Sequence, residues 1–291
     1  SDVCSSDLHL RCQTSCVFIL LRGVYTMQLV LNGKKMNCPC DHLEDLKAAY
    51  GSGQEIIIVN GFATTENLAL KEGDEIYFIP KDRLPPKEAL EGMMCSRHTP
   101  KVHQKVSAGR VAICGLGGLG SNAAVYLART GVGHLHLIDF DTVDASNLNR
   151  QSYMVRDLGQ RKTDALARQI ADINPFIDVR TDFVRLTEDN VLTILKDDQV
   201  ICEAFDNPDA KTMLVHTILE QCPDKYIVSA SGMAGYGDSN AIETKKITSH
   251  FYICGDQTRN AKPGRGLMAP RVAICAGHEA NLILKLLVDV L

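Results

Sequence analysis

Residues 111–121 constrain this chain more than any other stretch of the sequence. They read Val-Ala-Ile-Cys-Gly-Leu-Gly-Gly-Leu-Gly-Ser, an apolar run that leads straight into Gly115, Gly117, Gly118 and Gly120. Residues 121–130 then have the pattern of a helix, so the segment predicts a strand, a glycine turn and a helix. A turn without Cβ atoms lets phosphates approach the backbone, and its free N–H groups and the helix N-terminus favour a bound anion. This pattern is typical of the first βαβ unit of a nucleotide- or dinucleotide-binding domain.

A second apolar strand is predicted at residues 134–138, and it ends in Asp139, 24 residues after Gly115. This spacing places the Asp139 carboxylate to accept hydrogen bonds from a ribose. By itself the glycine pattern does not distinguish ATP from a nicotinamide dinucleotide. The residues after Asp139 favour ATP, because an aspartate, two asparagines, an arginine and a glutamine follow within 12 residues. Such a cluster suits a charged triphosphate with its metal ion.

Two more polar positions follow from the predicted elements. Lys162 opens a helix predicted at residues 163–174, where its side chain can reach phosphate oxygens. The apolar strand at residues 199–202 leads into Glu-Ala-Phe-Asp-Asn at the carboxyl edge of the predicted parallel sheet, where ligands of open α/β sheets bind. Asp206 in this run is suited to a magnesium ion, because Mg²⁺ prefers carboxylate oxygens.

The composition limits the class of protein. At 291 residues the chain is long enough for one large α/β domain and a small companion. Its formal net charge is −4 and its basic residues are dispersed, so neither nucleic acid nor an anionic membrane is expected as the principal partner. No stretch approaches the roughly 20 apolar residues that span a bilayer. These features predict a cytoplasmic protein.

The cysteines argue against a structural zinc site. There are 11 of them and no Cys-x-x-Cys pair. Most lie in predicted core segments, as Cys114 and Cys202 do, and they are predicted to be reduced thiols. A structural zinc ion would have no pair of ligands to start from, so no zinc is expected.

Two segments are predicted to lie outside the packed domains. Residues 1–26 show neither a period of 2 nor one of 3.6 over a useful length, so they are predicted to be a leader left by cloning, sequencing or gene assignment. Residues 83–92, which contain Pro85-Pro86, are predicted to be a linker. Residues 80–108 as a whole are predicted to be irregular, with one helical piece around residues 87–93.

Residues 27–82 predict a small β-rich domain. Two strands, at residues 27–31 and 34–39, flank Asn32-Gly33, which supplies the positive φ angles of a tight hairpin. Asp41 is predicted to cap a helix at residues 43–50, and strands follow at residues 56–59 and 75–79. This order is that of a ubiquitin-like β-grasp domain.

The small domain resembles the ThiS family, the sulfur carriers of thiamine synthesis. The resemblance rests on Met-Gln-Leu-Val-Leu-Asn-Gly from residue 27, Val-Asn-Gly from residue 59 and Leu-Lys-Glu-Gly-Asp-Glu from residue 70. ThiS carriers end in Gly-Gly just after the last strand, and the carboxylate of that tail is activated. Here the chain runs on without Gly-Gly, so the domain is expected to dock, regulate or stabilise rather than to carry sulfur.

Residues 93–291 resemble the ThiF, MoeB and HesA adenylyltransferases of the ubiquitin-activating-enzyme superfamily. The resemblance rests on the order and spacing of the glycine run, Asp-Phe-Asp from residue 139, Ser-Asn-Leu-Asn-Arg-Gln from residue 146, Lys162 and Phe-Asp-Asn from residue 205. It is closest to a clostridial-type branch of ThiF, because of Arg-His-Thr-Pro from residue 97 and Gly-Leu-Met-Ala-Pro-Arg from residue 266. The implied fold is α/β, a Rossmann-like nucleotide-binding domain with a mostly parallel sheet, preceded by the β-grasp domain.

The resemblance implies a role for each site residue. The phosphates would lie against the glycine turn, at Gly115, Gly117 and Gly118, and Asp139 would hold the ribose hydroxyls. The nucleotide would also be bound by Ser146, Asn147, Asn149, Arg150, Lys162 and Asn207. Arg150 and Lys162 would neutralise charge at the α-phosphate from opposite sides, and Asp206, with Asp141, would bind Mg²⁺. Arg150, Lys162 and Asp206 are therefore the expected catalytic residues.

The implied reaction is attack by the C-terminal glycine carboxylate of a ThiS-type carrier on the α-phosphate of MgATP. Pyrophosphate leaves, and the acyl-adenylate then receives sulfur from a persulfide donor such as a cysteine desulfurase. The family usually forms homodimers, in which Arg97 would correspond to an arginine that reaches the partner's site. The loop after Cys254 contains no cysteine, so no covalent carrier intermediate is expected. Residues 231–237, rich in glycine, are expected near the channel for the carrier tail.

Other functions remain as alternatives. One alternative is adenylation of a different acceptor, the molybdopterin carrier or tRNA threonylcarbamoyladenosine, although the ThiS-like domain favours thiamine. An NAD-dependent oxidoreductase is the rival from another class, but Arg150, Lys162 and Asp206 are superfluous for hydride transfer. A third interpretation is a non-catalytic ATP-binding sensor gated by the β-grasp domain, against which the same three intact residues argue.

Overall fold

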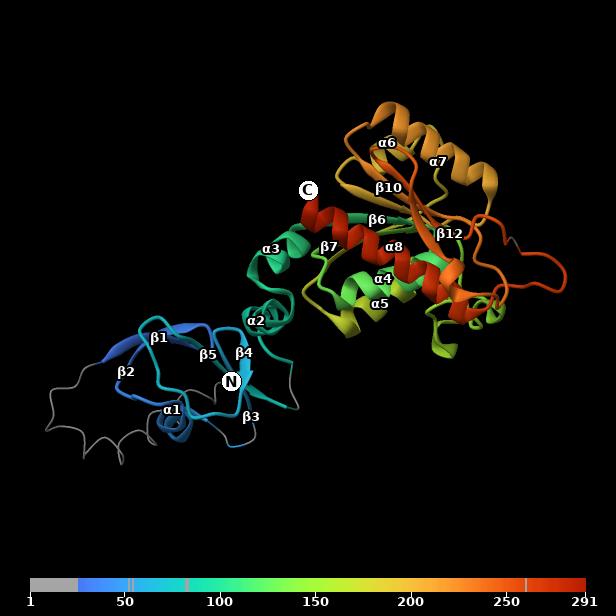
Figure 1. Ribbon diagram of the computed structural model, residues 1–291. Helices are drawn as coiled ribbons and strands as arrows, with labels where there is room; N and C mark the ends of the chain where they lie inside the picture. The colour runs from blue at the N-terminus through green and yellow to red at the C-terminus, as the bar shows by residue number, and fades with distance from the viewer. Residues whose placement is uncertain (1–25, 52, 54, 82–83, 260) are drawn as a thin grey trace, which may run out of the picture. The chain divides into compact units, whose positions relative to one another are not determined.

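The structure is a computed structural model that describes residues 26–51, 53, 55–81, 84–259 and 261–291. The predicted leader, residues 1–26, lies outside these residues except for Thr26. The chain divides into two compact units between Pro100 and Lys101, and each unit is described by itself (Figure 1). The predicted boundaries at residues 82 and 93 stay a prediction.

The smaller unit contains a β-grasp sheet. Its elements are β1 Met27–Leu31, β2 Lys34–Cys38, α1 Leu43–Tyr50, β3 Glu55–Val59, β4 Phe62–Thr64 and β5 Glu75–Pro80. The five strands stand in the order β2-β1-β5-β3-β4, and β1 runs parallel to β5. The hairpin between β1 and β2 turns at Asn32 and Gly33, with φ angles of 50° and 78°, as predicted.

Both faces of this sheet are covered by helices. On one face, α1 packs on a core that includes Leu29, Leu43, Leu46, Ile57, Ile76 and Phe78. On the other face, helix α2 (Lys87–His98) brings Ala89 and Met93 against Ile58, Tyr77 and Ile79. Successive residues of β3 and β5 therefore enter opposite cores, as the alternation of side chains along a strand requires.

Two details of the smaller unit differ from the prediction. Asp41 does not cap α1, because His42 occupies the N-cap position and makes no side-chain cap hydrogen bond. The oxygen Oδ1 of Asn67 instead accepts from the Glu44 N–H at 3.0 Å, so a distant loop supplies the cap. The short strand β4 was not among the predicted elements, and it follows a second Asn-Gly turn at residues 60 and 61, with φ angles of 52° and 85°.

The segment predicted to be largely irregular, residues 80–108, is mostly helical, so the prediction of one helical piece is wrong. Helix α2 continues to His98, and α3 (Pro100–Ala108) follows, with Thr99 between them at a φ of 71°. In the larger unit Val106 of α3 enters the core, and Lys105 Nζ donates to the carbonyl oxygen of Val288 at 2.6 Å. The start of α2 agrees with the predicted helical piece, and the error lies in its continuation to His98 and in α3.

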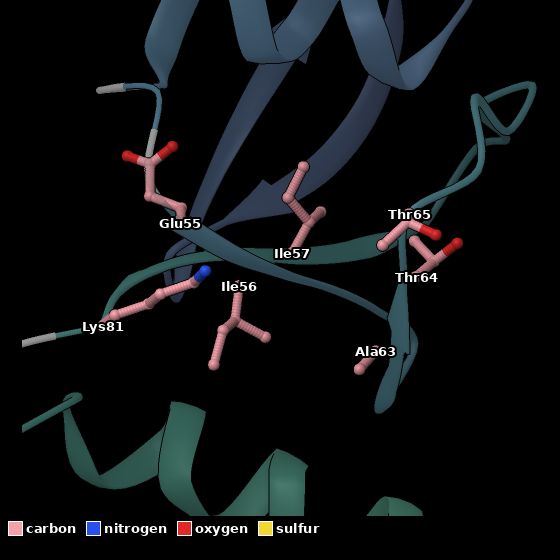
Figure 2. Close-up of a pocket in the computed structure, with 7 residues that line it drawn as sticks. All are labelled: Glu55, Ile56, Ile57, Ala63, Thr64, Thr65 and Lys81. Atoms are coloured by element: carbon pink, nitrogen blue, oxygen red, sulfur yellow. The ribbon is translucent and has the colours of Figure 1, made fainter.

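The smaller unit carries a pocket of about 300 Å³ (Figure 2). Figure 2 shows Glu55 and Lys81 at one end of it and the β4 side at the other, with Ile56 and Ile57 between them. No residue predicted for the nucleotide site lines this pocket.

The larger unit is a seven-stranded sheet between two layers of helices (Figure 1). Its strands are β6 Arg110–Cys114, β7 His134–Asp139, β8 Asp178–Phe183, β9 Val200–Glu203, β10 Tyr226–Ala230, β11 Glu243–Lys246 and β12 Phe251–Gly255. Its helices after α3 are α4 Gly118–Arg129, α5 Lys162–Ile173, α6 Val191–Ile194, α7 Pro208–Gln221 and α8 Ala269–Asp289. Helices α4, α5 and α8 build the core on one face of the sheet, and α6 and α7 build the core on the other.

The strand order of the larger sheet fixes where a ligand binds. The order is β11-β12-β10-β9-β6-β7-β8, and each strand is parallel to its neighbours except β11, which is antiparallel to β12. From β6 the chain builds β7 and β8 on one side, and it then returns to build β9 and β10 on the other. The order therefore reverses between β6 and β9, and open α/β sheets bind their ligands at the carboxyl ends of such strands. This arrangement confirms the predicted Rossmann-like α/β class.

The sequence pattern of β6 follows from this architecture. Residues Val111 to Cys114 are all buried, because helices cover both faces of the parallel sheet. Helix α4 begins at Gly118, three residues before the predicted start, so part of the glycine run is helical.

Among the described residues, no helix combines the length and the apolar character needed to cross a membrane.

Candidate functional site

The glycine turn between β6 and α4 forms an open cradle where the strand order reverses. A Cβ atom on Gly115, which has a φ of 92°, would lie 2.9 Å from the carbonyl oxygen of Ala204, so the chain after β9 packs directly on the turn. A Cβ on Gly117 would meet nothing within 4 Å. Gly117 is also the N-cap of α4 and makes no side-chain hydrogen bond there. The first N–H groups of α4 thus lack a side-chain cap, as in helix N-termini that bind phosphate.

Asp139 fastens this turn to the end of β7. Its side chain is buried, and one carboxylate oxygen accepts from the Leu116 N–H at 2.6 Å while the other accepts from the Asp141 N–H at 2.8 Å. Tyr153 donates its hydroxyl to the carbonyl oxygen of Leu116 at 2.9 Å, and burial, then the nearby Asp139 charge, raises the pKa of that hydroxyl. Each Asp139 oxygen keeps a further lone pair, and its role toward a ribose stays a prediction.

Arg150 lies over the glycine turn. A Cβ on Gly118 would meet Arg150 Cγ at 3.4 Å and Cδ at 3.6 Å, so the stem of the arginine covers the start of α4. Its Nη1 donates to Ser146 O at 3.2 Å and to Asn149 Oδ1 at 2.8 Å. Its Nε is buried and has no hydrogen-bond partner among the described residues. Asn122 of α4 donates to the carbonyl oxygen of Arg150 at 3.0 Å, which holds the segment on the helix.

The residues just before Arg150 form a short capped turn. Asp144 accepts from the Ser146 N–H at 2.8 Å, and the Asp144 N–H donates to Asn147 Oδ1 at 3.0 Å. The hydrogen bonds from Ser146 lower the pKa of the exposed Asp144 carboxyl. Asn147 therefore uses its amide oxygen within the turn, which leaves its amide nitrogen as the donor toward a ligand. Ser146 is exposed beside it.

Lys162 and Asp141 form a pair at the end of β7. Lys162 is the first residue of α5 and is buried, and its Nζ lies 3.0 Å from Asp141 Oδ2. The Lys162 N–H also donates to the carbonyl oxygen of Asp141 at 3.0 Å. The Asp141 N–H in turn donates to Asp139, so these predicted residues are joined in one network. Two of the three Lys162 ammonium hydrogens remain for another acceptor.

Asp206 lies on the loop between β9 and α7, on the other side of β6. Its carboxylate is exposed and has no hydrogen-bond or ion-pair partner among the described residues. Asn207 caps α7, because its Oδ1 accepts from the N–H groups of Asp209 at 2.9 Å and Ala210 at 3.0 Å. Strand β6 stands between β9 and β7, so Asp206 and Asp141 follow strands that are not direct neighbours in the sheet. Among the described residues Asp141 is paired with Lys162 and Asp206 is unpaired, and a joint role of the two carboxylates toward Mg²⁺ stays a prediction.

These residues fit a nucleotide with its metal ion. Within the part of the chain that the structure describes, the cradle at Gly117 is open, the buried Nε of Arg150 has no hydrogen-bond partner, and the Asp206 carboxylate is unpaired at the same edge of the sheet. Among the described residues, no three or more His, Cys, Asp or Glu side chains gather as a metal site. Mg²⁺ in nucleotide sites takes most of its ligands from phosphates and water, so one or two protein carboxylates suffice.

Cys254 is a buried thiol. It lies at the end of β12 with no exposed surface, and burial, then the charge of Glu279, raises its pKa to about 12. Its reactive thiolate form is therefore scarce at neutral pH. The absence of a covalent bond between a cysteine of this region and a carrier stays a prediction.

The glycine-rich segment at residues 231–237 packs against its own chain. A Cβ on Gly232 would lie 2.3 Å from Asp256 Oδ1, and one on Gly237 would lie 1.4 Å from the Arg259 guanidinium. The buried Arg271 at the start of α8 pairs with Asp256 and donates to the carbonyl oxygen of Gly237 at 3.0 Å. The glycines make room for these neighbours, and a channel for a carrier tail stays a prediction.

The sequence reasoning missed a buried charged cluster next to the Asp206 loop. Glu203 and Glu279 are both fully buried, and Lys211 Nζ and Ser229 Oγ donate to Glu203 Oε2. Glu279 Oε1 lies 3.9 Å from Cys202 Sγ, and Glu279 Oε2 has no partner among the described residues. Burial raises the pKa of Glu279 to about 8, an effect that Lys211 opposes and Glu203 reinforces. The available signal was a glutamate at the end of the apolar strand and another inside an apolar helix.

Glu279 predicts a pH dependence of stability. Its pKa is higher in the folded chain than the ordinary glutamate value of 4.5. The folded state therefore binds more protons between pH 4.5 and 8, and its stability falls as the pH rises through this window. We expect wild-type protein to lose about 2–3 kcal/mol of stability from this group between pH 6 and 9. Glu279→Gln cannot ionise, so it should lose that much less over the same interval in urea unfolding.

The control for this measurement is Glu188→Gln, at an exposed glutamate of the same unit. It should reproduce the difference between pH 6 and pH 9 that wild-type protein shows. A Glu279→Gln variant with the same pH dependence as wild-type protein would show that this carboxyl does not titrate in the folded chain.

Comparison with known proteins identifies two matching sequence families. The sequence model of the ThiF family matches residues 92–290, and that of the ThiS-like ubiquitin family matches residues 27–82. The adenylyltransferase and sulfurtransferase UBA4 of Yarrowia lipolytica is 30% identical over 189 residues, which are 62% of this chain and 46% of that protein. The probable adenylyltransferase/sulfurtransferase MoeZ of Mycobacterium tuberculosis is 41% identical over 99 residues, 34% of this chain and 25% of that protein. The chain thus spans less than half the length of these relatives.

Solved structures show the same fold. The tRNA N6-threonylcarbamoyladenosine dehydratase TcdA of E. coli, solved with ATP, has a TM-score of 0.63 at 24% identity, over 70% of this chain and 97% of that one. E. coli MccB, also solved with ATP, has a TM-score of 0.52 at 21% identity, over 73% of this chain and 67% of that one. At these identities the likeness establishes the fold alone. Because the ThiF family model covers more than half of the sequence, the chain belongs to the ThiF family.

Proposed function

We propose that this chain adenylates the C-terminal glycine carboxylate of a ubiquitin-like sulfur-carrier protein, with MgATP as the second substrate. The observation that carries the proposal is the position of Arg150, whose stem covers Gly118 and whose buried Nε has no partner among the described residues. A buried donor on a cation next to an anion cradle is suited to a phosphate oxygen. The relatives named as adenylyltransferases support the same chemistry.

The proposed reaction joins two anions, a carboxylate and a triphosphate, so the site has to offset their repulsion with positive charge. The carrier carboxylate attacks the α-phosphate of ATP, the bond between the α-phosphorus and the bridging oxygen breaks, and pyrophosphate leaves. No side chain has to form a covalent bond, so the protein contributes positioning and positive charge. The glycine turn would hold the phosphates, and Arg150 and Lys162 would offset their charge. Asp206 would hold a Mg²⁺ ion, which would supply further positive charge to the phosphates.

Within this chemistry we take the acceptor to be a ThiS-type carrier that feeds the thiazole of thiamine. The support is the match of residues 27–82 to the ThiS-like ubiquitin family. After β5 the chain continues into α2, so this domain has no free carboxylate of its own and a separate carrier must be the substrate. A persulfide donor such as a cysteine desulfurase then supplies sulfur. The proposed assembly is a homodimer, with the exposed Arg97 of α2 reaching the partner's site.

The experiment that tests this function is the exchange of labelled pyrophosphate into ATP, with ThiS-type and molybdopterin-type carriers added singly. We expect exchange with the ThiS-type carrier, and none when its last glycine is removed or when EDTA replaces Mg²⁺. Exchange with the molybdopterin-type carrier alone would keep the adenylation and change the acceptor. Tight ATP binding without exchange in the presence of either carrier would contradict the proposal.

A further inference from the structure

The position of Asp206 depends on its neighbours, because its own side chain has no partner among the described residues. On one side of the loop, the Ala204 N–H donates to the carbonyl oxygen of Cys114 at 2.9 Å. On the other side, Asn207 is fixed as the cap of α7. Between these two anchors, the Phe205 N–H donates to Glu203 Oε1 at 2.9 Å. The bond to Glu203 therefore fixes the residue just before Asp206, as the α7 cap fixes the residue just after it.

Glu203 is held by three elements. It is the last residue of β9 and has no exposed surface, and it pairs in register with Cys114 of β6 and Ser229 of β10. The Ser229 hydroxyl donates to Glu203 Oε2 at 2.5 Å, and the Lys211 ammonium from the first turns of α7 donates to the same oxygen. A buried carboxylate is tolerated only when it is paired and hydrogen-bonded, and Lys211 supplies the pairing charge.

This arrangement explains why a charged residue ends an apolar strand. A carboxylate binds a backbone N–H more strongly than a neutral acceptor does. One of its oxygens is used for the Phe205 N–H, and the other is anchored by Lys211 and Ser229. The cluster thus joins the loop to α7 and β10 without using the Asp206 side chain, which stays free for a ligand.

We propose that Glu203 and Lys211 are positioning residues, which hold the Asp206 loop at the glycine turn so that Asp206 can bind the metal ion of the nucleotide. The inference rests on the proposed function, because it assigns Asp206 to Mg²⁺. Neither residue touches the substrates. Their contribution is the orientation of the residue that does, as with the outer partners that orient metal ligands.

Two double variants separate this role from a purely structural one. Glu203→Gln/Lys211→Met removes both charges but keeps an amide oxygen at position 203 for the Phe205 N–H. Glu203→Met/Lys211→Met removes both charges and that acceptor. Replacement of a buried ion pair by uncharged side chains is often neutral for stability, so both variants are expected to fold. They differ in the acceptor at position 203, which serves the Phe205 N–H and the Ser229 hydroxyl.

The readout is the affinity for ATP with Mg²⁺ relative to the affinity in EDTA, measured by calorimetry at pH 6.5, where Glu279 is protonated, together with the melting temperature. Wild-type protein and Glu203→Gln/Lys211→Met are expected to gain affinity from Mg²⁺ by similar factors. Glu203→Met/Lys211→Met should lose about tenfold or more of that gain while its affinity for metal-free ATP is kept. If it gains as much as wild-type protein does, the positioning role is refuted.

If Glu203→Met/Lys211→Met does not fold, the single variant Lys211→Met decides the question. It leaves Glu203 buried without its counter-ion, so it should weaken the Mg²⁺-dependent gain, and the added Glu203→Gln change should restore it. A Lys211→Met protein with the wild-type gain would overturn the proposal. Wild-type protein that binds ATP no better with Mg²⁺ than in EDTA, or supports no carrier-dependent exchange, would instead count against the proposed function.

Discussion

Arg150→Ala is expected to lower the rate of carrier-dependent pyrophosphate exchange by about 10²–10³-fold, the effect of removing one preorganised donor at a developing charge. The aliphatic stem of Arg150 lies over Gly118, and its buried Nε has no hydrogen-bond partner among the described residues. The folded state should survive, because the only hydrogen bonds of this side chain to described residues are those to Ser146 and Asn149 of its own loop. Arg150→Lys should recover little, because an ammonium group lacks the Nε donor and the planar fork.

The matched control is Arg129→Ala. Arg129 is the exposed last residue of α4, the helix that begins at the cradle, and it lies about 16 Å along the axis from Gly118 at roughly 1.5 Å per residue. Its removal takes away the same charge at a distance, so the exchange rate should stay within about twofold of wild type. Equal losses in both variants would mean that net charge rather than position matters. An unchanged rate in Arg150→Ala would remove the main support for the proposed site.

Gly120→Ala is expected to destabilise the larger unit severely. A Cβ at this position would lie 1.9 Å from the carbonyl oxygen of Gly115 and 3.0 Å from Ile113 Cγ2. The first of these atoms belongs to the backbone of the turn, which β6 and Asp139 hold in place, so neither side can yield. We expect a loss of about 3 kcal/mol or more, which lowers the melting temperature by roughly 10 °C. Urea and thermal unfolding measure this directly.

Gly117→Ala is the matched variant within the same turn. A Cβ here meets nothing within 4 Å, so the melting temperature of the ligand-free protein should change by only a few degrees. The added methyl group would fill the cradle instead, and we expect the affinity for ATP to fall at least tenfold, about 1.4 kcal/mol. A Gly117→Ala protein that binds ATP as wild-type protein does would show that phosphates do not lie at this glycine. A Gly120→Ala protein with wild-type stability would show that the turn differs from the one described.

The strands and helices of the larger unit were predictable because their patterns are long and agree with one another. The apolar run of β6, the glycine turn and the helix after it specify one arrangement, and the order of alternating strands and helices specifies a parallel sheet. The exact start of α4 was not predictable, because glycine is a poor helix former and its place in a helix is decided by packing on the turn. The same reason explains why the glycine run ends inside the helix.

In the smaller unit, strand β4 and the cap of α1 were not predicted from the sequence. Asn32-Gly33 predicted its hairpin correctly, and Asn60-Gly61 carries the same signal, but β4 is so short that no alternating pattern follows it. Asp41 was chosen as a cap because of its residue type, whereas Asn67 supplies the acceptor from 23 residues away. Such a contact depends on the tertiary fold and leaves no local pattern in the sequence.

In the candidate site, the placement of the residues was predictable and their pairing was not. The motifs predicted that Arg150, Lys162 and Asp206 lie at the carboxyl edge of the sheet. The glycine turn lies at this edge, next to the point where the strand order reverses. Which side chains are already engaged was not predictable, because pairing depends on distances across the sheet. Lys162 is paired with Asp141, and Asn207 is occupied as a helix cap, whereas Asp206 is unpaired. The buried Glu203 and the partly exposed Lys211 were missed because their partners lie on separate elements.

The most direct test of adenylation is the mass of the carrier itself. The ThiS-type carrier is incubated with this protein, ATP and Mg²⁺, the mixture is quenched in acid, and the intact carrier is weighed by mass spectrometry. The account predicts that the carrier gains one adenylyl group, and that the gain is absent with EDTA, with Arg150→Ala protein or with a carrier that lacks its last glycine. A carrier of unchanged mass, with the ThiS-type and the molybdopterin-type proteins alike and with ATP shown to be bound, would contradict it.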